Sequence, residues 1–175
     1  MLRIYYFFNS TPDAIIGIFT LTYVPNYFDI LPTYIVIMLL IPPIMLLASY
    51  HIWYVPVACF SIYLTVWWFG LELPAEIISD RPWFFNPLAW QLMFFTGFML
   101  GAKWIIFPNR SKIIFIASLF FIFYTIPISH YFFYNFLWTN EIVSDIHAML
   151  ELYMIKTNLG ILRWLHFLTL AYVVT

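Results

Sequence analysis

The feature that most constrains the fold is a long run without charge. From Ile30 to Leu71 the chain contains no Asp, Glu, Lys or Arg. Because one helical crossing of a bilayer takes roughly 20 apolar residues, this run is long enough for two crossings. The whole chain is 65% hydrophobic and 9% charged, whereas soluble domains carry about a quarter charged residues. The sequence therefore predicts an integral membrane protein with more than one span.

The predicted fold class is all-α, a polytopic transmembrane helical bundle forming one membrane domain over residues 1–175. Strands of alternating apolar and polar residues, the pattern of outer-membrane barrels, are absent. The five predicted spans are Leu31–Ser49, His51–Gly70, Pro87–Phe107, Ile113–Tyr134 and Leu159–Thr175. We expect residues 1–30 to form an interfacial or re-entrant segment and Glu141–Lys156 to form an amphipathic surface helix.

Helix boundaries follow from capping chemistry. Asp29 with Pro32 predicts one helix start, and Asn86 as N-cap with Pro87 at the first helical position predicts another. Pro42 and Pro43 predict a kink within the first span. Gly97 and Gly101, four residues apart, are compatible with close approach of a second helix.

Charge distribution predicts orientation and excludes one class of partner. The basic loop at Arg110 and Lys112 is expected in the cytoplasm, and the acidic loops, at Asp29 among others, are expected outside. Seven Lys and Arg against eight Asp and Glu leave no basic surface for nucleic acid.

The last predicted span contains ionisable side chains, which are energetically costly to place inside a bilayer. On one continuous helix Lys156, Gly160, Arg163 and His166 would share a face about 80° wide. Such a face suits an anion: Arg163 can bind an oxyanion with two parallel hydrogen bonds, and His166 can accept a proton. The alternative is that Arg163 reaches the interface and His166 is a hydrogen-bonded core residue.

Three other polar residues are candidates for substrate binding: Asp29, Asn86 and Gln91. Asn86 and Gln91 could bind a sugar hydroxyl at the outer membrane face, although capping and cross-linking of helices is the favoured role. His147 and Glu151 lie four residues apart, but two ligands do not make a metal site, so no metal is predicted.

Four stretches of the chain together resemble the OpgC membrane proteins, which are integral-membrane acyltransferases of the acyltransferase-3 type. The stretches are Tyr23–Val36, Trp83–Leu92, the pair Gly97 and Gly101, and Lys156–Leu168. The resemblance covers most of the chain from about Tyr23 onward, and the order and spacing of the stretches make it fairly specific for the family. It is much less specific for the substrate.

The resemblance implies acyl transfer, with succinyl from a cytoplasmic succinyl-CoA-like thioester to a hydroxyl of a periplasmic glucan or other glycan, at the bacterial inner membrane and in contact with lipid. No bound cofactor is implied. Arg163 and His166 would be catalytic, and Lys156, Asp29, Asn86 and Gln91 would bind substrate. The superfamily also has an Arg and a His about ten residues apart on its first helix, and this chain has no such pair. We therefore expect a central portion of the family, catalytically incomplete by itself.

Two other classes of function fit the same sequence. A non-catalytic membrane subunit that binds a sugar or lipid would keep the Lys156, Arg163 and His166 face without an acyl donor. A small transporter fragment would show paired broken helices in an inverted repeat, which the sequence lacks.

Overall fold

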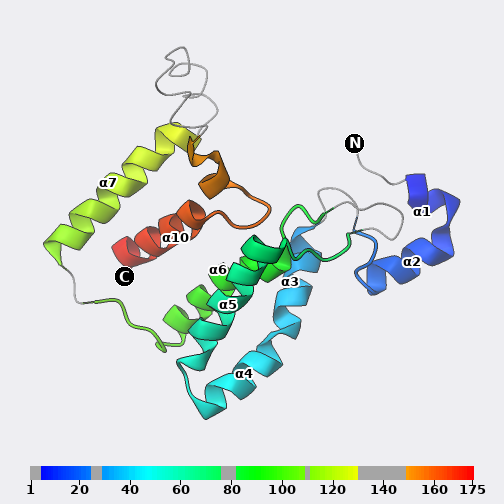
Figure 1. The fold of residues 1–175 in the computed structure, drawn as a ribbon, viewed down its shortest axis with the longest axis horizontal. Coiled ribbons are helices and arrows are strands. Elements are labelled where there is room, and N and C mark those ends of the chain that lie inside the picture. The colour runs from blue at the N-terminus through cyan, green and yellow to red at the C-terminus, as the bar shows by residue number, and fades with distance from the viewer. Residues whose placement is uncertain (1–4, 25–28, 76–81, 109–110, 130–148) are drawn as a thin grey trace. The chain divides into compact units, whose positions relative to one another are not determined.

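The computed structural model describes the chain except for residues 1–4, 25–28, 76–81, 109–110 and 130–148. The described residues form helices and turns without a strand, and Pro74 and Pro82 form an isolated bridge. This confirms the all-α prediction for the described part of the chain. The helices are α1 (Tyr5–Asn9), α2 (Thr11–Phe19), α3 (Ile30–Leu39), α4 (Ile41–Tyr50), α5 (Tyr54–Phe69), α6 (Pro87–Gly101), α7 (Lys112–Ser129) and α10 (Ile161–Val174) (Figure 1).

The chain divides into two compact units. The first comprises Met1–Trp104 with Lys156–Asn158, and the second comprises Ile105–Ile155 with Leu159–Thr175. Each unit is described by itself below. The single membrane domain expected from the sequence stays a prediction.

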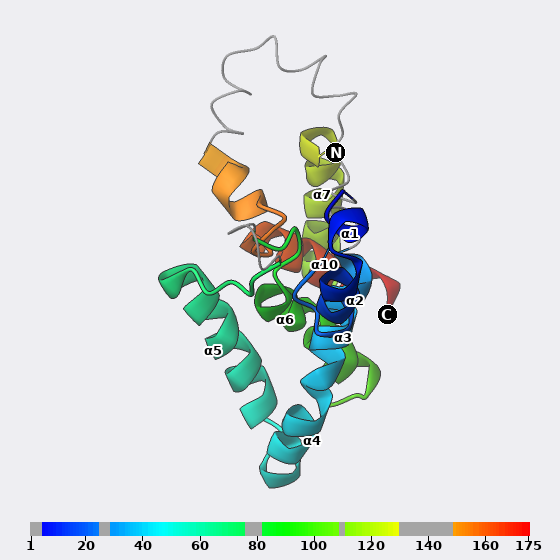
Figure 2. The same cartoon turned by 90° about the vertical axis from the view of Figure 1, so that its right-hand side faces the viewer.

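In the first unit, α3 and α4 follow each other with one interruption, at Leu40 (Figure 2). The interruption lies just before Pro42 and Pro43, which occupy the first turn of α4. Proline has no N–H and cannot continue the helical hydrogen bonds of the preceding turn. The kink predicted at these prolines is found as this interruption between α3 and α4.

The core of the first unit lies mainly between α5 and α6, with α3 packed on the other side of α6. On α5 and α3 the buried residues recur every three or four positions, which places them on one side of each helix. They are Val55, Cys59, Tyr63 and Val66 of α5, and Thr33 and Ile37 of α3. The buried residues of α6 cover a wider face, as expected for a helix that contacts two others: Pro87, Ala89, Gln91, Leu92, Phe95, Thr96 and Met99.

Two helices of this unit have boundaries that differ from the sequence prediction, α5 at its start and α6 at its end. Helix α5 begins at Tyr54, three residues after the predicted start, and stops before Gly70, whose φ is 61°. Helix α6 was expected to reach Phe107 but ends at Gly101. Lys103 has φ 57°; its N–H donates to Leu100 O at 3.1 Å, and the N–H of Trp104 donates to Met99 O at 2.8 Å. This Schellman closure ends the helix.

The N-terminal segment, predicted as interfacial or re-entrant, contains α1 and α2 in its described part. Pro12 lies in the first turn of α2, where its missing N–H costs nothing. Helix α2 ends where Leu21 takes φ 59°. The interfacial or re-entrant placement of residues 1–30 in a bilayer stays a prediction.

The second unit pairs α7 with α10. Helix α7 runs to Ser129, and the rest of the predicted span to Tyr134 lies outside the described residues. Of the predicted amphipathic helix, residues 149–154 are helical and the part before Met149 lies outside the described residues. Helix α10 begins at Ile161, two residues later than predicted.

Taken together, α3 and α4 cover Ile30–Tyr50. Among the described helices, this is the segment whose 21 residues and mean hydropathy of 2.4 meet the length and composition of a membrane span. Tyr54–Phe69, Lys112–Thr125 and Ile161–Val174 are apolar but shorter. The prediction of five spans is thus not confirmed.

Candidate functional site

A four-residue segment, Trp83–Asn86, connects several parts of the first unit directly before α6. Trp83 Nε1 donates to Pro74 O at 3.1 Å, and Phe84 N donates to Asp29 Oδ2 at 2.6 Å. Phe85 O accepts from Thr33 Oγ1 at 3.1 Å. Each of these residues therefore makes a hydrogen bond to another segment of the chain. We call Trp83–Asn86 with its partners the junction.

Asp29 enters the junction from the N-terminal end of α3. It is the N-cap residue of this helix, and its main-chain oxygen accepts from Thr33 N at 2.9 Å. The predicted helix start is confirmed. Its carboxylate is 1% exposed and faces Phe84, so in this structure it holds the junction and is shielded from solvent.

Asn86 makes the largest number of these contacts. Its Oδ1 accepts from Leu88 N at 3.1 Å, as expected for an N-cap. Its Nδ2 donates to Leu71 O at 2.8 Å and to Asn158 Oδ1 at 3.2 Å, and its main-chain N donates to Thr157 O at 3.0 Å. The predicted N-cap is confirmed, and the same side chain joins two distant segments.

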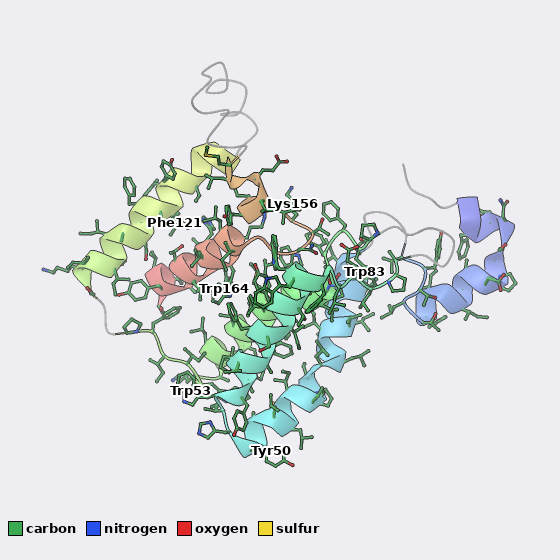
Figure 3. All side chains as sticks on the ribbon, in the orientation of Figure 1. Tyr50, Trp53, Trp83, Phe121, Lys156 and Trp164 are labelled. Carbon is green, nitrogen blue, oxygen red and sulfur yellow. The ribbon has the colours of Figure 1, made fainter. Side chains whose placement is uncertain are left out.

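The segment Lys156–Asn158 completes the junction from the C-terminal part of the chain. Besides the contacts with Asn86, Lys156 O accepts from Trp90 Nε1 at 2.9 Å. The Lys156 side chain is exposed, and Figure 3 labels it together with Trp83. Lys156 is therefore held by its backbone while its ammonium group reaches solvent.

Three stretches that carry the sequence resemblance thus meet in the junction. Asp29 and Thr33 belong to Tyr23–Val36, Asn86 and Trp90 to Trp83–Leu92, and Asn158 to Lys156–Leu168. Hydrogen bonds between distant segments explain why these polar residues stand within an apolar chain.

Gln91 lies apart from the junction contacts, between α6 and α5. It is fully buried, and its Nε2 donates to Cys59 O at 2.7 Å. Its Oε1 has no hydrogen-bond partner within the described part of the chain. Gln91 thus cross-links two helices through a backbone carbonyl.

In the second unit Arg163 is fixed near the start of α10. Its Nε donates to Met154 O at 2.6 Å. The neighbouring Gly160 N donates to Ile155 O at 2.8 Å. Arg163 and Gly160 therefore satisfy carbonyls at the end of the helical residues 149–154, which would otherwise lack donors.

His166 faces α7, one helical turn after Arg163. Its Nδ1 lies 3.0 Å from Thr125 Oγ1, and its ring lies 6.3 Å from the Phe121 ring. Phe121 is labelled on α7 in Figure 3. Both Arg163 and His166 are partly buried.

The shared face predicted for four residues is wrong in part. Residues 156–159 are turns and α10 begins at Ile161, so Lys156 and Gly160 precede the helix. Arg163 and His166 remain about 60° apart on one side of α10. A Cβ at Gly160 would overlap the Tyr153 carbonyl group, so only glycine fits at this close approach.

Two residues that bond to the side chains of candidate residues were not themselves candidates. Asn158 and Thr125 contact Asn86 and His166 through side-chain atoms. Asn158 lies inside the stretch Lys156–Leu168 that carries the resemblance, whereas Thr125 had no signal in the sequence. His147, the other half of the weak pair with Glu151, lies outside the described residues.

Comparison with known proteins gives a family. The family model described as OpgC protein matches residues 1–175, which is the whole chain. Neither a curated protein nor a solved structure matches the chain. The match over every residue shows that the chain belongs to the OpgC protein family.

Proposed function

We propose that the chain serves in O-acyl transfer at the bacterial inner membrane, moving succinyl or another acyl group from a thioester donor to a hydroxyl of a periplasmic glucan or another envelope sugar. The observation that carries the proposal is the family match over residues 1–175. The junction supports it, because the stretches on which the resemblance depends are joined by hydrogen bonds.

Contact with lipid is supported by the outward side of α3 and α4. Side chains there are large, apolar and exposed: Leu31 is 72% exposed, Leu39 67% and Leu46 62%. Of the most apolar stretch of 18 residues within Ile30–Tyr50, only 17% is buried. In water such a surface would be unfavourable, whereas a hydrocarbon environment accepts it.

The chemical roles fall to Arg163 and His166 of α10. His166 Nε2 would take the proton from the sugar hydroxyl as its oxygen attacks the thioester carbon. The new C–O bond forms, the C–S bond breaks, and the thiolate leaves and takes up a proton. The Arg163 Nη groups would bind an anionic part of the donor, a carboxylate or a phosphate.

Asp29, Asn86 and Gln91 would then support the site through the fold. Their side chains bond to Phe84 N, to Leu88 N with Leu71 O, and to Cys59 O. Lys156, whose ammonium group is exposed, is the member of the substrate-binding set that can meet a ligand without rearrangement.

The test uses membranes containing the protein as the cell makes it, with labelled succinyl-CoA as donor and a β-glucan oligosaccharide as acceptor. We expect Arg163→Ala and His166→Ala each to reduce labelled ester by about 100-fold or more, with unchanged amounts in the membrane. Lys112→Ala and His51→Ala are controls, since both residues are exposed.

Normal transfer by both α10 variants would refute the assigned sites. Absence of transfer by the unaltered protein would refute the reaction. If the unaltered protein then still bound the oligosaccharide, the sugar-binding subunit would replace the acyltransferase.

A further inference from the structure

Thr125 and His166 face each other across the α7–α10 pair. Thr125 Oγ1 lies 3.0 Å from His166 Nδ1 and 2.8 Å from Ile122 O, three residues earlier on α7. The Ile122 carbonyl oxygen can only accept a hydrogen bond. The hydroxyl group therefore stands between an obligatory acceptor and a ring nitrogen.

The proton count decides how these groups interact. A threonine hydroxyl has one proton to donate and two lone pairs. When that proton is donated to Ile122 O, the oxygen can meet His166 Nδ1 only by accepting from an Nδ1–H group. A neutral imidazole carries one proton, so Nε2 is then left with its lone pair.

We propose that Thr125 is a positioning residue that holds neutral His166 as the Nδ1–H tautomer, with Nε2 ready to accept a proton. The tautomer is argued from the contacts of α7 and α10 alone, and its use in catalysis rests on the proposed function. In this arrangement a neutral hydroxyl does the orienting that a carboxylate or carbonyl oxygen performs for many catalytic histidines.

Two other residues contact His166 without bonding to Nδ1, one at its ring and one at its main chain. The Phe121 ring lies beside it, and Thr169 Oγ1 donates to the main-chain oxygen of His166 at 2.9 Å. Thr169 therefore offers a matched control: it is also a partly buried threonine in contact with His166, but not with the imidazole.

The first measurement is nitrogen-15 NMR of the full chain in detergent micelles, with labelled histidine, on the neutral form of the imidazole. We expect Nε2 to show the signal of an unprotonated ring nitrogen and Nδ1 that of a protonated one. Thr125→Val keeps the side-chain shape and removes the hydroxyl, so it should shift the population toward Nε2–H. Thr125→Ser and Thr169→Val should leave the tautomer unchanged.

The second measurement is acyl transfer from succinyl-CoA to the β-glucan oligosaccharide by the same variants in membranes. Thr125→Val should lower the rate by about 10-fold or more, and Thr125→Ser should restore it. An Nε2–H tautomer in the unaltered protein, or a Thr125→Val spectrum equal to that of the unaltered protein, would overturn the proposal. The predicted tautomers without any acyl transfer would keep the role of Thr125 and remove the proposed function.

Discussion

Asn86 Nδ2 donates a hydrogen bond of 3.2 Å to Asn158 Oδ1, 72 positions later in the chain. The same Asn86 side chain caps α6 through Oδ1. Because an amide has separate donor and acceptor atoms, one residue can start a helix and hold a distant segment at once. Asn86 therefore links a local feature of the sequence with the tertiary fold.

The first prediction concerns this pair. Asn86→Ala removes a cap that contributes about 1 kcal/mol and two further hydrogen bonds of about 1 kcal/mol each. Asn158→Ala removes one of these bonds. In a double-mutant cycle, unfolding in micelles should give a coupling energy of about 1 kcal/mol between the two changes. As a control, Asn9→Ala at an exposed position of α1 should change the free energy of unfolding additively with Asn158→Ala. If the effects of Asn86→Ala and Asn158→Ala were also additive, the hydrogen bond between Asn86 and Asn158 would be contradicted.

The second prediction compares two glycines. A Cβ at Gly160 would overlap the Tyr153 carbonyl group, whereas a Cβ at Gly101 would meet no atom of the described residues within 4 Å. Gly160→Ala should therefore lower the free energy of unfolding by about 1–3 kcal/mol, as overpacking does. Gly101→Ala should be neutral or raise it by up to about 1 kcal/mol, since alanine favours the helix. Equal thermal stability of the two variants would contradict the close packing at Gly160.

The helix starts were predictable because their signals are local, although Asn86 caps its helix with its side chain and Asp29 makes no side-chain cap bond. Asp29 and Asn86 were both identified from one residue and a nearby proline, and the break before Pro42 followed from the missing N–H. The end of α6 was not predictable, because Lys103 closes it in a left-handed conformation that usually calls for glycine. Within the described part of the chain the space at Gly101 is likewise open, so no close approach is seen there at the second residue of the pair Gly97 and Gly101.

The candidate residues of the site were found by chemistry, but their partners were not. Gln91 bonds to Cys59 O and Arg163 to Met154 O. A backbone carbonyl has the same form at every position, so no residue type marks it in a sequence. The face shared by Lys156 with Arg163 was wrong because residues 156–159 form turns and α10 begins only at Ile161, an interruption that the apolar periodicity does not mark.

The third prediction separates a structural from a substrate-binding role for Gln91. Gln91→Leu loses the bond to Cys59 O but also removes the buried Oε1 that has no partner among the described residues. Stability should change by no more than about 1 kcal/mol. Gln91→Glu puts a carboxylate against the same carbonyl and should cost about 3 kcal/mol or more. Loss of transfer by a stable Gln91→Leu protein would instead place Gln91 in contact with substrate.

The fourth prediction concerns the form of the charge at position 163. The Arg163 Nε donates to Met154 O, which leaves the Nη groups for an anion. A lysine has one ammonium group and cannot hold the carbonyl and bind an oxyanion with two parallel bonds together. Arg163→Lys should therefore raise the KM for succinyl-CoA about tenfold, a loss of about 1.4 kcal/mol, with kcat less affected.

The control for this change is Lys112→Arg, which alters the same chemical group at the exposed start of α7 and should leave KM unchanged. If Arg163→Lys kept the normal KM and kcat but lowered the melting temperature, Arg163 would act only as the anchor of the Met154 carbonyl. If both KM and stability stayed normal, neither role would stand. The lysine variant thus distinguishes a guanidinium that recognises the donor from one that only ties α10 to residues 149–154.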